Sequence, residues 1–212
     1  MGKSNRKPSP LLLGLAVGLV LLAAGCLEKR QPAPVKNYVL EYPAPAAAKK
    51  TLPQTIKVRR FNAAREADGT GMAFKPGPFQ RDAYLYHRWI SAPADMISDL
   101  LFRDLAASRA FAAVFGPDDT ARARFELQGG LLECLQVREN GQWLARLKLT
   151  ATLLDNQSKR LPGRVAWQRD YKATKPLAEN SPEGLARAMS LALQDLSATL
   201  RQDLAARASL AK

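Results

Sequence analysis

Histidine and cysteine are scarce in this chain of 212 residues, which has one histidine, His87, and two cysteines, Cys26 and Cys134. A Ser-His-Asp triad would need His87 as its base, and no Gly-x-Ser-x-Gly turn accompanies that histidine. The sequence also has no phosphate-binding glycine loop, no CxxC pair and no HExxH motif. These absences favour a binding or structural role over catalysis, so we expect no enzyme activity, no metal and no bound cofactor.

Acidic residues are few as well, 19 against 32 lysines and arginines, and the formal net charge is +13. Asp118-Asp119 could form a carboxylate pair, but two aspartates directly after Pro117 are more typical of a turn. The positive charge favours an anionic partner such as lipid head groups, an acidic protein surface or nucleic acid. Because the basic residues are scattered and not clustered, they indicate a solvated surface more than a binding stripe.

The N-terminus has the pattern of an export signal. Three basic residues precede an uncharged apolar run of 14 residues, Leu11 to Ala24. As a helix this run would reach about 21 Å, short of the roughly 30 Å hydrocarbon core of a bilayer. A basic start, a short apolar segment and a small-residue cleavage site describe a secretory signal peptide. The sequence Leu22-Ala23-Ala24-Gly25-Cys26 resembles the lipobox of bacterial lipoproteins, which predicts cleavage after Gly25 and a covalent lipid such as palmitate on Cys26. An ordinary signal peptide that happens to contain a cysteine is the alternative.

Three segments follow from this pattern: a signal peptide over 1–25, a lipidated tether over 26–36 and a single α/β domain over 37–212. The tether carries two prolines among polar residues, and ten such residues span at most about 33 Å. An exported protein rarely meets nucleic acid, so we expect no nucleic-acid partner. With Cys26 acylated, Cys134 has no partner for an intrachain disulfide and is expected to act as a small buried hydrophobe.

The first half of the domain predicts four strands and a helix. Residues 37–42 and 55–61 are β-prone. Residues 72–74 and 83–89 flank the turn residues 75–78 and predict a hairpin, with Tyr84 and Tyr86 on one side and Leu85 and His87 on the other. A helix opening at Pro93 has its apolar stripe at Ile97, Leu100, Leu101 and Leu105.

The second half predicts three further strands and a long helix. Two alternating runs, 125–137 and 143–153, flank Asn140-Gly141, which is a strong hairpin signal. A third strand presents Val165, Trp167 and Tyr171 on one face. A helix starting at Ser181-Pro182 carries its apolar stripe at Leu185, Met189, Leu193, Leu196, Leu200 and Leu204. The expected fold is therefore an α+β, two-layer sandwich, a mainly antiparallel sheet with two amphipathic helices on one face.

The order of these features resembles a known family, the ABC-type transport auxiliary lipoproteins of the PqiC/YmbA-like group. The resemblance covers about 37–206 and is best over 83–115, which ends in the pattern Phe111-x-x-Val114. It departs from the family at 72–80, which puts the shape of that hairpin in doubt. Beside the lipobox, it rests on Tyr38-Val39-Leu40, Tyr86-His87-Arg88-Trp89 and Pro93-Ala94-Asp95.

This resemblance implies an outer-membrane lipoprotein that faces the periplasm and serves a lipid transport system with MCE-domain and permease or ATPase subunits, in support of membrane integrity. Leu27, a non-aspartate after the acylated cysteine, agrees with outer-membrane sorting in lipoproteins of this kind. We expect Tyr84, Tyr86, Arg88 and Trp89 to contribute to partner docking or to formation of a homo-oligomer, unless Trp89 and one tyrosine only pack beneath the first helix. A structural or assembly lipoprotein of the envelope is the alternative function, and an envelope hydrolase would need a constellation that the sequence lacks.

Overall fold

The computed structural model describes residues 33–158 and 164–210, so the predicted signal peptide and Cys26 lie outside the described residues. Residues from Val35 onward form one compact unit. Its described part holds one nine-stranded sheet, a short 3-10 helix η1 and two α-helices. The strands are β1 Lys36–Tyr38, β2 Leu52–Val58, β3 Asn62–Ala63, β4 Gly71–Lys75, β5 Asp82–Trp89, β6 Phe111–Phe115, β7 Phe125–Glu139, β8 Gln142–Asp155 and β9 Val165–Pro176. The helices are η1 Arg65–Ala67, α2 Pro93–Ser108 and α3 Pro182–Leu210.

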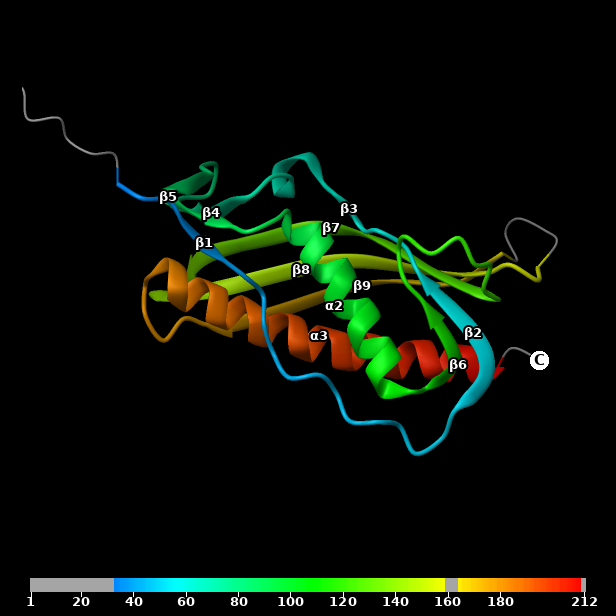
Figure 1. Cartoon of the computed structure of the whole chain (residues 1–212). Coiled ribbons are helices and arrows are strands. Elements are labelled where there is room, and N and C mark those ends of the chain that lie inside the picture. The colour runs from blue at the N-terminus through cyan, green and yellow to red at the C-terminus, as the bar shows by residue number, and fades with distance from the viewer. Residues whose placement is uncertain (1–32, 159–163, 211–212) are drawn as a thin grey trace, which may run out of the picture. The chain divides into compact units, whose positions relative to one another are not determined.

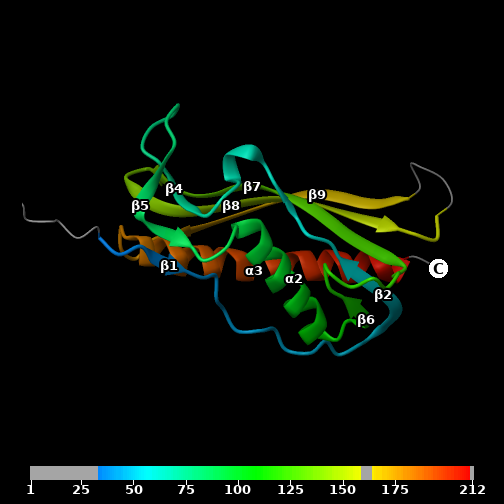
Figure 2. The same cartoon turned by 45° about the horizontal axis from the view of Figure 1, so that its top comes forward.

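The two α-helices lie on the same side of the long strands β7, β8 and β9 (Figures 1 and 2). A two-layer arrangement follows from the sequence, because each helix has one apolar stripe and the strands alternate apolar with polar side chains. The expected α+β fold is confirmed.

The hairpin β7–β8 forms where the Asn-Gly signal places it. Asn140 and Gly141 have φ angles of 48° and 79°, the left-handed conformation that a two-residue hairpin turn requires. The ladder runs antiparallel from Phe125 opposite Asp155 to Glu139 opposite Gln142. Strand β9 then pairs antiparallel with β8, so the predicted three-stranded meander is confirmed.

The rest of the sheet is mixed, and this refines the expected mainly antiparallel arrangement. Strands β2, β3 and β4 all pair parallel with β7, β1 pairs parallel with β5, and β6 with β2. Among the described strands, only the pairs β4–β5, β7–β8 and β8–β9 are antiparallel. Parallel pairs join segments that are distant in sequence, so no local turn signal announces them.

Some strand boundaries differ from the prediction. Strand β2 ends at Val58 and not at residue 61, and β1 ends at Tyr38, after which residues 39–42 continue without a ladder. Strand β6 was not expected, although Phe111 and its neighbours are strongly apolar. It follows α2 directly because Arg109 takes a left-handed conformation, φ 50°, that ends the helix and redirects the chain.

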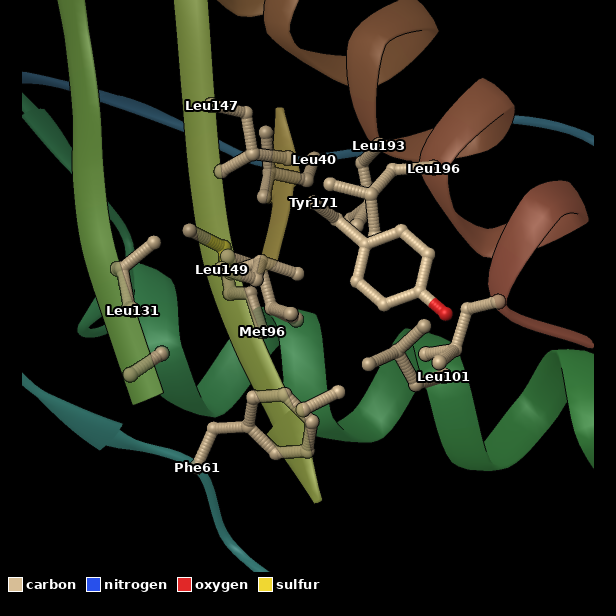
Figure 3. Packing of buried hydrophobic residues seen from close by; sticks show 14 of the residues in the cluster. Leu40, Phe61, Met96, Leu101, Leu131, Leu147, Leu149, Tyr171, Leu193 and Leu196 are labelled. Atoms are coloured by element: carbon tan, nitrogen blue, oxygen red, sulfur yellow. The ribbon is translucent and has the colours of Figure 1, made fainter. Parts of the chain in front are cut away.

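The core lies between the meander and the two helices. Every residue of the predicted α3 stripe is buried, as are Ile97, Leu101 and Leu105 of the α2 stripe, whereas Leu100 is only partly buried. Figure 3 shows Met96 and Leu101 of α2 and Leu193 and Leu196 of α3 meeting Leu149 and its neighbours on the sheet. Each such side chain contributes about 1.5–3 kcal/mol by its removal from water. Among the described helices, none is long and apolar enough to cross a membrane.

Candidate docking face beside the N-terminal strand

Strand β5 carries all four residues of the predicted docking set, and its alternation is irregular. Ala73 of β4 pairs with Ala83 and Gly71 with Arg88, so one residue of β4 stands opposite the four residues 84–87. Extra residues on one strand form a bulge that re-aims the side chains. The prediction that Tyr84 faces away from His87 is therefore wrong, since their ring centroids lie 6.0 Å apart.

The inward-facing residues of β5 hold the strand in place. Trp89 is 1% exposed, so it cannot present its ring to a partner. Tyr84 is half-buried, and its hydroxyl donates a hydrogen bond of 3.0 Å to Oε1 of Gln136 on β7. Burial raises the pKa of this Tyr84 hydroxyl. The burial of Trp89 corrects its inclusion among the docking residues. Tyr84 supports the sheet through Gln136, and docking by its exposed part stays a prediction.

His87 has a structural contact of the same kind. Its Nδ1 lies 2.9 Å from the hydroxyl of Tyr38, which belongs to the neighbouring strand β1. The backbone N–H of Ile90 donates to the Tyr38 carbonyl at 2.8 Å, one step beyond the strand pairing. Together these bonds fix β1, the first strand after the tether, to the edge of the sheet.

Six exposed residues in β5 or directly next to β1 and β5 make up what we call the β1–β5 face: Val35, Val39, Leu85, Tyr86, Arg88 and Ile90. Tyr86, Ile90 and Leu85 are 44%, 57% and 72% exposed. Arg88 stands opposite Asn37 in register and makes no ion pair with any described residue. An apolar surface around a free cation is suited to protein contact. Docking by Tyr86 and Arg88 stays a prediction.

Directly after β1 the chain crosses the helices and is fastened there (Figure 1). Leu40 and Tyr42 are buried, and the backbone N–H of Glu41 donates to Ser190 Oγ of α3 at 3.0 Å. The Tyr42 hydroxyl donates to Oδ2 of Asp104, in α2, at 2.8 Å. The segment that leads from the tether into the domain is thus bonded to both helices.

Asp104 is the centre of this attachment, which we call the Asp104 network: Tyr42, Arg103, Asp104 and Ser197. Oδ2 of Asp104 also accepts a hydrogen bond of 2.6 Å from Ser197 of α3. Its Oδ1 accepts two from Arg103, at 2.7 and 3.0 Å, and that guanidinium lies 4.6 Å from the Tyr42 ring centroid. The carboxylate is buried and fully paired, so it is not available to act on a substrate.

Burial, together with the adjacent Asp104 carboxylate, raises the pKa of the Tyr42 hydroxyl well above its usual range. This network was missed in the sequence because its members lie up to 155 positions apart, from Tyr42 to Ser197. The only local signal, Tyr42 before Pro43, indicates an extended segment and nothing about its partners.

The other chemically interesting residues are kept apart. Cys134 is buried, and burial raises the pKa of its thiol to about 12, so it stays a neutral hydrophobe as expected. Asp118 pairs with Arg60, while Asp119 Oδ2 accepts from the N–H of Gly116, which is a turn and not a catalytic pair. Within the described part of the chain, no three His, Cys, Asp or Glu residues are placed to hold a metal ion.

Proteins of known structure share this fold. A protein of Xanthomonas campestris with a crystal structure is 19% identical, covers 83% of this chain and 98% of its own, and superposes with a TM-score of 0.74. A hypothetical protein of Chlamydia trachomatis is 10% identical over 74% of this chain and 98% of its own, with a TM-score of 0.53. At these identities the likeness shows the fold alone. No curated protein matches the chain.

The family comparison shows a family, whereas the similar structures show only the fold. The model of the ABC-type transport auxiliary lipoprotein component matches residues 38–200. That range runs from the last residue of β1 to within α3, and so includes the Asp104 network and, apart from Val35, the β1–β5 face. This protein belongs to the family of ABC-type transport auxiliary lipoprotein components.

Proposed function

We propose that the protein is a lipoprotein anchored in the outer membrane, facing the periplasm, and that it is the non-catalytic auxiliary subunit of an intermembrane lipid transport system with MCE-domain and permease or ATPase subunits. The observation that carries this is the family match over 38–200, which follows a lipobox ending at Cys26. Family membership supports the transport role, and the lipobox supports the anchor. The MCE and outer-membrane assignments are the finer part of the proposal.

The lipid anchor and the folded domain have separate physical roles. Acyl chains on Cys26 contribute about 0.8 kcal/mol per buried CH₂, and more than one chain is needed for stable anchoring. The tether allows about 33 Å between the lipid and β1. Because residues 41 and 42, which follow β1, are bonded to both helices, a pull on the tether that detaches β1 would be resisted at this attachment before it reaches the rest of the domain.

The proposed docking surface is the β1–β5 face, with Tyr86 and Arg88 as its main contributors. It lies next to the point where the tether enters the domain, so a bridging subunit bound there would be held near the anchored membrane. An aromatic ring and an arginine are the residue types that most often dominate binding energy at protein interfaces.

The anchor is tested by metabolic labelling with palmitate and by membrane fractionation. We expect Cys26→Ser to abolish labelling and release the protein from the membrane. Cys134→Ser is the matched control, because it removes the other cysteine and should leave labelling intact. Unchanged labelling of Cys26→Ser would contradict the anchor.

The partnership is tested by capture of MCE-domain and permease subunits from detergent-solubilised envelopes. We expect Arg88→Glu to reduce capture at least ten-fold, whereas Arg187→Glu, an equal charge reversal on the exposed side of α3, leaves it unchanged. An anchored protein that captures neither subunit would support the alternative, a structural or assembly lipoprotein of the envelope. Neighbouring genes for MCE-domain and permease proteins would favour transport.

A further inference from the structure

A second surface feature lies at the end of the sheet away from β1 and β5, where β2 and the ends of β8 and β9 meet (Figures 1 and 2). A cleft of about 580 Å³ opens there. We call it the basic cleft, and its charged and amide lining residues are Lys57, Arg59, Arg122, Glu126, Asn156 and Arg164.

The charges of this cleft do not balance. Among the residues that the structure describes, four cationic side chains line it against one carboxylate, that of Glu126. Glu126 Oε1 lies 3.4 Å from Arg59 Nε and so compensates that arginine. Neighbouring Arg60 differs sharply, because it pairs with both Asp99 and Asp118 at 2.8 and 2.9 Å.

Lys57 is the most informative member of the cleft. It is 6% exposed and lies in β2, which is paired on both sides, with Phe115 of β6 and Glu126 of β7 in register. Its ammonium donates to the backbone carbonyl of Asp119, and no described carboxylate forms an ion pair with it. A buried cation without a counter-charge is unfavourable in an empty site and is stabilised when an anion binds beside it.

The walls of the cleft are held in position by hydrogen bonds of Asn156. The N–H of Asn156 donates to the carbonyl of Arg124 at 2.8 Å, and its side-chain amide donates to the carbonyl of Ala123 at 3.0 Å. Arg164 Nη2 in turn donates to Asn156 Oδ1 at 3.0 Å. These bonds tie the loop before β7 to the ends of β8 and β9, so little ordering remains when a ligand binds.

The lining also limits the chemistry of the ligand. Within the described part of the lining, the apolar members are Ala121 and Ala123, which could not solvate an acyl chain. Guanidinium groups and an ammonium in one cleft are well suited to the oxygens of a phosphate, which accept paired N–H donors.

We propose that the basic cleft binds a phosphate group, carried by a phospholipid head group or present as free phosphate. The head-group form rests on the proposed role in lipid transport. Binding of inorganic phosphate does not depend on it. The two proposals can therefore fail separately, since anchoring and subunit capture are measured without reference to the cleft.

The test is calorimetric titration of the full-length lipoprotein in neutral detergent, with inorganic phosphate, glycerophosphoglycerol and an acidic glutamate peptide as probes. The double variant Arg122→Gln/Arg164→Gln should weaken phosphate binding at least ten-fold. Both side chains are exposed, so folding should be unaffected. The matched control, Arg187→Gln/Arg207→Gln, removes the same charge from exposed positions of α3 and should leave binding unchanged.

The probes separate the sources of the phosphate. Glycerophosphoglycerol binding at least ten-fold more tightly than inorganic phosphate would identify a lipid head group, whereas equal affinities would identify free phosphate. Absence of binding, an equal loss in the control, or tighter binding of the glutamate peptide would overturn the proposal. Lys57→Met provides a second variant within the cleft and should also lose at least ten-fold in affinity.

Discussion

The Asp104 network and the basic cleft each contain a buried charged residue, but only the charge in the Asp104 network is compensated by its neighbours. Asp104 is 1% exposed and receives four hydrogen bonds from Tyr42, Arg103 and Ser197. Lys57 is nearly as buried, but its only described partner is a backbone carbonyl. A charge that the chain itself compensates holds segments together, whereas a charge that it leaves uncompensated is available to a ligand.

The largest expected effect on stability is in the Asp104 network. Asp104→Ala should lower the free energy of unfolding by about 3–5 kcal/mol, because it leaves Arg103 and two hydroxyls without their acceptor. Chemical denaturation measures the loss. Asp99→Ala, on the exposed side of the same helix, is the control and should cost less than about 1 kcal/mol. Equal losses in the two variants would show that the charge compensation of Asp104 does not hold segments together.

Alkaline pH should also lower the stability of the folded protein, through the deprotonation of two buried groups. Burial raises the pKa of the Cys134 thiol to about 12, and burial with the Asp104 carboxylate raises the pKa of the Tyr42 hydroxyl. The unfolded chain releases these protons at lower pH than the folded chain. Stability is therefore complete below about pH 8.5 and falls as pH rises, by about 1.4 kcal/mol per pH unit for each titrating group.

Denaturation curves between pH 8 and 11 check this dependence. In Cys134→Ala the loss should begin only near pH 10, in the range of the tyrosines. A stability that stays level up to pH 11 would contradict the assignment of these protons to buried sites.

A smaller change probes one bond of the network. Tyr42→Phe removes the hydroxyl that donates to Asp104 but keeps the ring beneath Arg103, so we expect a loss of about 1 kcal/mol. Tyr86→Phe, on the exposed β1–β5 face, should change the free energy of unfolding by less than about 0.5 kcal/mol. A reversed order would show that the N-terminal segment is not fastened through Tyr42.

A small effect on stability is expected in the basic cleft. Lys57→Met removes a buried, uncompensated charge and one hydrogen bond to a carbonyl, two effects of opposite sign. We expect the free energy of unfolding to change by less than about 1 kcal/mol while phosphate binding falls. A large loss of stability without a loss of binding would make Lys57 a structural residue, like Asp104.

Regular segments were predictable because their signals are local. Asn140-Gly141 specifies the turn of β7–β8, and a stripe at helical spacing, as in α3, reports which face is buried. The bulge of β5 could not be predicted, since it depends on how Gly71 and Ala73 pair with a strand ten or more residues away. The two missed regions, the Asp104 network and the basic cleft, each join residues from at least three separate parts of the chain.

The sequence by itself determined the two amphipathic helices and the antiparallel meander, because each depends on residues that are close together in the chain, and it predicts the export signal on the same kind of local pattern. Only the tertiary structure decided the parallel pairing of β1 through β4, the burial of Trp89 and the contrast between Asp104 and Lys57. Burial and charge compensation are properties of neighbours in space, and folding brings those neighbours from distant segments.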